Sequence, residues 1–115
     1  MSWRLTIVVL LAALAGCRGD PPLESRYQAA AQLSDRYERD DSLRQIALDA
    51  TRQGRAEIAD KAIDGMTRGS LRDDTAQWCA EGFDRQHRRD LAVAFVRKID
   101  NGPRREALMR SLAAP

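Results

Sequence analysis

The chain has 115 residues, of which 31% are charged and six are aromatic, and glycine and proline are sparse. This composition excludes a disordered tail and is typical of one small helical domain with a charged surface. The net charge is only +2, with basic and acidic residues closely alternating, whereas nucleic-acid-binding proteins gather basic residues on one face. We therefore expect no nucleic-acid partner.

The stretch 1–16 has the three-part form of an export signal. Arg4 supplies the positive charge, residues 5–13 are apolar apart from one threonine, and the small residues Ala15 and Gly16 precede Cys17. A helix over 5–16 would be about 18 Å long, whereas a bilayer core is ~30 Å thick. The sequence therefore predicts a signal peptide over 1–16 and no transmembrane helix.

The residues Leu14-Ala15-Gly16-Cys17 resemble the lipobox of bacterial lipoproteins. In that family the cysteine sulfur carries a diacylglycerol, the leader is cut just before the cysteine, and the new amino group is often acylated. The resemblance implies cleavage after Gly16 and lipid attachment at Cys17, with enough acyl chains for stable anchoring. The alternative is an ordinary secretory leader followed by a chance cysteine.

A short linker, residues 17–22, joins the lipidated cysteine to the rest of the chain. The five residues after Cys17 reach at most about 18 Å, and Pro21-Pro22 stiffens them. The domain over 23–115 is thus expected close to the bilayer. In two-membrane bacteria of the best-studied type, an Asp after the lipidated cysteine keeps lipoproteins in the inner membrane. Arg18 stands at that position here, so the resemblance favours the periplasmic side of the outer membrane.

From residue 39 onward the chain repeats itself, with a period of about 33 residues. Copy 39–69 and copy 72–102 share nine identities over 31 positions, where chance would give about two or three. A partial third copy occupies 105–115. Apolar residues at helical spacing predict two helices in each copy, separated by Gly54 in the first copy and His87 in the second.

We expect six helices in all, the first of them before copy one and out of strict register with the repeat. The predicted ranges are 23–37, 40–53, 55–66, 71–86, 88–100 and 103–113.

These copies resemble the tetratricopeptide-like class of helix-pair repeats. Small residues pack the first helix and an alanine with a bulky apolar residue recurs in the second, although the usual tryptophan, glycine and tyrosine of the first helix are missing. The resemblance implies an all-α fold, a short right-handed-type α-solenoid of antiparallel helix pairs. A related helical repeat fits equally well.

Cys79 and His87 are the two residues whose chemistry stands out. Cys79 replaces Ile46 on the apolar face of the repeat, and if Cys17 carries lipid it has no partner within the chain, so we expect a buried, inert thiol. His87 is the only histidine, and we expect a structural residue of the turn. One histidine does not make a zinc site, and we expect neither a metal nor a cofactor.

Paired aspartates, Asp40-Asp41 and Asp73-Asp74, occupy matching positions of the two copies. We expect them at helix starts, where they stabilise the helix dipole and the first turn. Ser70 with Asp73 approximates a capping box. Catalysis would need two carboxylates that converge on one cleft. The spacing of the repeat does not bring these pairs together, so we expect a structural role for them.

Copy two is apolar on a second side. Trp78 replaces Gln45, and Val93 and Ala94 replace a charged pair. One interpretation is that Trp78 contacts the first or the last helix. The other is that Trp78 and Val93 mark a surface for a protein partner.

The sequence thus predicts a lipid-anchored envelope protein that binds a protein partner as a scaffold or adaptor, since stacked helix pairs offer an extended surface. The alternative is a small structural or stress-related envelope lipoprotein without a dedicated partner. We do not expect an enzyme or a small-molecule substrate.

Overall fold

The computed structural model describes residues 22–115, and its secondary structure there is all helical. The predicted all-α class is confirmed. The predicted leader and Cys17 lie outside the described residues. The six helices of this part of the chain are α2 (Leu23–Ala31), α3 (Arg36–Arg52), α4 (Ala56–Asp64), α5 (Gly69–Arg85), α6 (Arg89–Val96) and α7 (Gly102–Ala113).

The largest error in the predicted boundaries concerns the first helix, which was expected to run to residue 37. It ends at Ala31 instead, and α3 begins at Arg36. Asp35 causes the early start of α3, because its carboxylate accepts hydrogen bonds from the backbone N–H groups of Tyr37 (2.8 Å) and Glu38 (3.1 Å). Aspartate is among the preferred N-cap residues for this reason.

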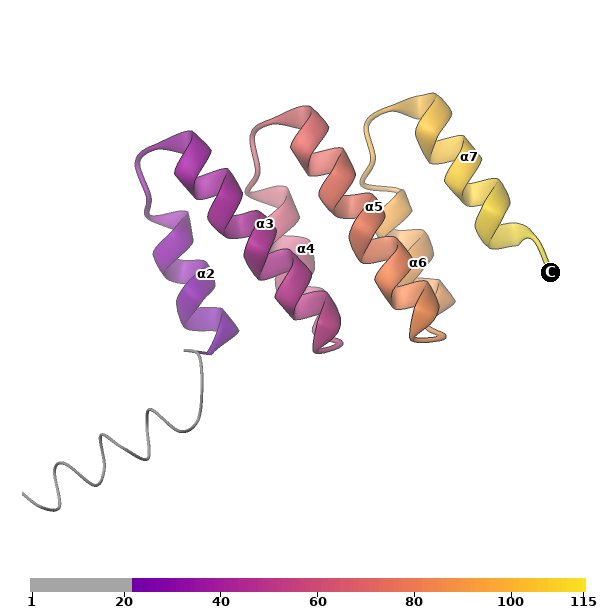
Figure 1. Cartoon of the computed structure of the whole chain (residues 1–115), viewed down its shortest axis with the longest axis horizontal. Coiled ribbons are helices and arrows are strands. Elements are labelled where there is room, and N and C mark those ends of the chain that lie inside the picture. Colours follow the sequence, from indigo (N-terminus) through magenta and orange to yellow (C-terminus); the bar gives the residue numbers. More distant parts are fainter. Residues whose placement is uncertain (1–21) are drawn as a thin grey trace, which may run out of the picture.

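The helices stack side by side along one direction (Figure 1). α3 packs against α4 and α5 against α6, while α3 and α5 also contact each other. α2 lies against α3 at one end, and α7 contacts α6 at the other. In the view of Figure 1, α4 and α6 lie behind α3 and α5.

Helix starts recur at a constant interval, which equals the period predicted from the sequence. α2, α4 and α6 begin at residues 23, 56 and 89, and α3, α5 and α7 begin at residues 36, 69 and 102. The prediction that the first helix is out of register was therefore wrong: α2 stands one full period before α4. The sequence of α2 does not show this register, because charged Arg26 occupies the position that corresponds to Ala59 in α4.

The core lies between the paired helices. The predicted inner face of α3 is buried, with Leu43, Ile46, Ala47 and Ala50 at most 3% exposed. In the second pair, the rings of Phe83 on α5 and Phe95 on α6 stack with centroids 5.2 Å apart. Burial of such side chains is the main stabilising term of a small helical domain.

The two turns within the pairs are alike. Gly54 has φ 72° and His87 has φ 60°, so both predicted turn residues adopt the left-handed conformation. In each turn, the backbone N–H of the residue after the left-handed one donates a hydrogen bond to a carbonyl of the preceding helix. Arg55 donates to Ala50, and Arg88 donates to Phe83. This is the Schellman motif, which ends helices with a left-handed residue.

Candidate functional site

Trp78, the predicted partner-surface residue, is partly buried on α5 and packs against the core. The guanidinium carbon of Arg52, at the end of α3, lies 5.1 Å from the centroid of its ring. This contact is with α3, which is neither the first nor the last helix, so the contact that the sequence analysis named for Trp78 stays a prediction. The indole is thus covered on one side by a cation and on another by the core.

Val93, the other predicted residue, lies on α6 and is partly buried. The observed neighbours of Trp78 belong to α3 and to the core, and no described contact joins it to Val93. The two residues stand on successive helices, α5 and α6. That Trp78 and Val93 contact a protein partner stays a prediction.

Cys79 is fully buried, as predicted. Its thiol donates a weak hydrogen bond to the carbonyl of Ala47, with Sγ and oxygen 3.7 Å apart. Burial raises the pKa of the Cys79 thiol to about 11, because an apolar surrounding disfavours the charged thiolate. Thiol chemistry requires the thiolate, so Cys79 is a packing residue in the folded protein.

Asp40 is a buried aspartate whose carboxylate accepts four hydrogen bonds. It is 0% exposed, and its carboxylate accepts hydrogen bonds from the backbone N–H groups of Thr67 (2.9 Å) and Arg68 (3.0 Å). The Thr67 hydroxyl and the Arg68 guanidinium also donate to it. Burial alone raises the pKa of this carboxyl, but these donors outweigh it and hold the pKa below its usual value.

Asp73, 33 residues after Asp40, forms an equivalent clamp. It accepts hydrogen bonds from the backbone N–H groups of Asp100 (2.9 Å) and Asn101 (3.1 Å). Both aspartates thus hold the loop that leads to the following helix, α5 or α7. The expectation that they stabilise their own helix starts was wrong, because α3 and α5 begin four residues before them.

The expected capping box at Ser70 is also absent. α5 begins at Gly69 with Arg68 at the cap position, and no side chain caps its first turn. The clamp of Asp73 on the loop before α7 takes the carboxylate that the box would have used.

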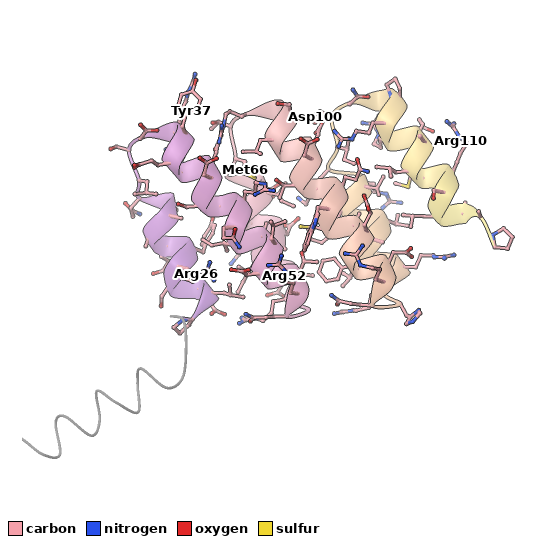
Figure 2. The ribbon with its side chains drawn as sticks, viewed as in Figure 1. Arg26, Tyr37, Arg52, Met66, Asp100 and Arg110 are labelled. Atoms are coloured by element: carbon pink, nitrogen blue, oxygen red, sulfur yellow. The ribbon has the colours of Figure 1, made fainter. Side chains whose placement is uncertain are left out.

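A surface that the sequence analysis missed surrounds Tyr37. This residue is 51% exposed, the one large hydrophobic side chain that is exposed in residues 22–115. The guanidinium carbons of Arg36 and Arg68 lie 5.0 Å and 5.1 Å from its ring centroid. Tyr37 projects from the edge opposite the intra-pair turns (Figure 2). The Arg36-Tyr37 dipeptide is visible in the sequence, but the first helix was predicted to run to residue 37, so the exposure of Tyr37 was not recognised.

Besides a hollow of about 390 Å³ at the two intra-pair turns, two hollows lie elsewhere on the surface of the stack. One, of about 360 Å³, lies between α2 and α3 and is lined by Ala29, Ala30 and Ile46, with Arg26 at its side. The other, of about 220 Å³, lies where α5, α6 and α7 meet, and Arg85, Val96 and Ser111 are among its lining residues.

Within the part of the chain that the structure describes, no group of three or more His, Cys, Asp and Glu residues is arranged to hold a metal ion. None of these helices is long and apolar enough to cross a membrane.

Comparison with protein-family models, with curated proteins and with solved structures yields no match for this chain.

Proposed function

We propose that the protein is a lipid-anchored protein of the bacterial envelope whose helical domain binds a protein partner. In this proposal the leader over 1–16 is removed, Cys17 carries the lipid, and the outer membrane is favoured over the inner one. The support for the anchor is the lipobox-like sequence around Cys17.

The domain is proposed to be a short α-solenoid of the tetratricopeptide-like kind, right-handed in type. Three features support this: helix starts at a constant interval, left-handed turn residues at Gly54 and His87, and equivalent loop clamps at Asp40 and Asp73. In such arrays each pair contacts only its neighbours, which leaves long exposed surfaces for binding.

The observation that carries partner binding is Tyr37, exposed between Arg36 and Arg68. Tyrosine and arginine are enriched among the residues that dominate binding energy at protein interfaces. An ordered aromatic ring flanked by two guanidinium groups needs little further ordering when a partner docks.

The position of Tyr37 also fits an anchor at Cys17. α2 begins at the edge that carries the intra-pair turns (Figure 1), and Glu24 in its first turn forms an ion pair with Arg55 of the first of these turns. The linker would thus tether this edge to the bilayer. Tyr37, at the opposite edge, would face away from the membrane toward a partner.

Photo-crosslinking tests partner binding directly. A crosslinking amino acid is placed at position 37 of the full chain, expressed in the source bacterium, and the control carries it at the exposed Lys61 on α4. We expect a discrete crosslinked product from position 37, weakened by Arg36→Ala and absent from position 61. Identical products from both positions, or none, would refute Tyr37 as the contact.

Mass spectrometry of the native protein tests the anchor separately. The expected mass is that of residues 17–115 with the lipid modification. A mature chain without lipid would exclude the anchor and the membrane location derived from it.

A further inference from the structure

The hollow between α5, α6 and α7 has a filled counterpart one repeat earlier. Ala80, Val96, Leu108 and Leu112 line the hollow, and the matching positions of the preceding repeat hold Ala47, Ile63, Thr75 and Cys79. All four of these counterparts are at most 1% exposed. Leu108 and Leu112, in contrast, are only partly buried. The same junction is therefore sealed in one place and open in the next.

The two junctions differ in helix packing, because α3 packs against α5 whereas α7 packs mainly on α6. Six of the eight lining residues also differ from their counterparts, and the largest loss of side-chain volume is at one of them. Trp78 packs against the core at the sealed junction, and its counterpart one repeat later is Ser111, which lines the open hollow. A serine leaves most of the volume of an indole unfilled, and an unfilled apolar hollow loses the contacts that its walls would make.

The cation that covers the ring recurs as well. Arg52 lies over Trp78, and Arg85, its counterpart in the next repeat, lines the hollow. The Arg85 guanidinium forms no ion pair with any carboxylate of the described residues. The hollow thus has apolar walls and an arginine, as the site of Trp78 has, but no aromatic ring lies in it.

Two carboxylates stand at the rim. Glu81 and Asp84 both line the hollow; Glu81 is exposed without an ion pair inside residues 22–115, and Asp84 has a single one, 3.7 Å long, to Arg89. A ligand that brings a positive charge beside its ring complements this rim.

We propose that this hollow receives an aromatic side chain, flanked by a basic residue, from the protein partner. The ring would pack between α5 and α7 as Trp78 packs at the preceding junction, with Arg85 stacked on it as Arg52 stacks on Trp78. This inference rests on the proposed partner binding and names the chemistry that the partner presents.

Short peptides serve as probes of the hollow. Acetyl-Lys-Trp-Lys-amide is titrated into the full-length protein in a neutral detergent, and backbone amide shifts are followed by NMR. We expect shifts at Arg85, Ser111 and Leu112 with a dissociation constant on the order of 1 mM. Acetyl-Lys-Leu-Lys-amide controls for apolar partitioning and acetyl-Glu-Trp-Glu-amide for charge, and both are expected to bind several-fold more weakly.

Matched variants locate the binding. Ser111→Trp should fill the hollow and abolish the shifts, and Ser111→Ala should keep them. If Ser111→Trp fails to fold, Arg85→Ala decides instead, with an expected two- to fivefold weaker affinity, about the worth of an exposed cation–π contact. The proposal is refuted if the hollow's amides do not shift up to about 20 mM peptide, well above the expected dissociation constant, or if the leucine peptide shifts them equally.

Shifts at the same amides that grow with protein concentration alone would also refute it, because a second copy would then be the occupant. The crosslinking experiment keeps the two proposals apart. Crosslinks at position 37 without peptide binding remove only the aromatic site, and peptide binding without crosslinks removes only the role of Tyr37.

Discussion

Asp40 of α3 accepts a 2.9 Å hydrogen bond from the backbone N–H of Thr67, although 27 residues separate them in the chain. The bond ties the start of one helix pair to the loop that begins the next. It is made inside the protein by a carboxylate that is 0% exposed. Hydrogen bonds to a buried charge are worth more than those between neutral groups.

Replacement of Asp40 by alanine should therefore be costly. Two backbone N–H groups and the Arg68 guanidinium would lose their acceptor, and we expect the free energy of unfolding to fall by about 3 kcal/mol. Asp41→Ala is the control, because it removes the exposed partner of the same arginine and should cost under about 1 kcal/mol. Urea unfolding measures both, and equal losses would contradict the clamp.

The same carboxylate makes stability depend on pH. The pKa of Asp40 is lowered in the folded protein, so the folded state resists its protonation. Its stabilising contribution is complete above the unfolded pKa of about 4 and is lost as the pH falls through the lower, folded value. Urea midpoints measured from pH 7 down to pH 2 should fall in acid, and Asp40→Asn should flatten the lower part of this curve.

α5 lies close to α3 at Gly82. A Cβ at this position would stand 2.7 Å from Cγ2 of Thr51. The Thr51 side chain is β-branched and 1% exposed, and its hydroxyl donates a hydrogen bond to the carbonyl of Ala47. We expect Gly82→Ala to destabilise the protein by about 1–3 kcal/mol, since the clash outweighs the better helix propensity of alanine.

Two variants test this explanation. Gly69→Ala meets no atom within 4 Å and should leave the melting temperature nearly unchanged. Thr51→Ser removes the clashing methyl group, so the double variant should recover part of the loss. Simple additivity of the two single substitutions would show that the clash is not the cause.

Cys79 should be inert in the folded protein. With a pKa of about 11, only about one thiol in a thousand is ionised at pH 8, and its sulfur is fully buried. Ellman's reagent should therefore react at least a hundredfold more slowly with Cys79 of the native protein than with the same thiol in urea. Rapid labelling without denaturant would contradict a closed core at this position.

The part of the fold that follows from local chemistry could be read from the sequence. Apolar spacing placed the buried face of α3, and Gly54 with His87 marked the turns, because a left-handed residue ends a helix wherever it stands. The clamp of Asp40 could not be read in this way. Its partners are backbone N–H groups 27 and 28 residues away, and any residue type at those positions except proline supplies the same donor.

The candidate surfaces were predicted only in part for the same reason, because they depend on contacts between residues that are distant in the sequence. Trp78 was recognised as unusual from its alignment with Gln45, but its packing under Arg52 depends on where α3 ends. Tyr37 was hidden because the break between α2 and α3 was missed. That an indole is missing at Ser111 can be recognised only by comparison with the junction around Trp78.

Trp78→Ser should remove from the first junction the aromatic ring that the second junction lacks. The substitution removes a partly buried indole, and we expect a loss of about 2 kcal/mol in the free energy of unfolding. Arg52→Ala, which removes only the covering cation, should cost under about 1 kcal/mol. The Trp78→Ser protein should also gain a second site for acetyl-Lys-Trp-Lys-amide, seen as new amide shifts at Ala47 and Cys79. A destabilised variant without these shifts would show that the wall residues collapse onto the vacated space, and that the apolar lining with its arginine does not suffice to bind a ring.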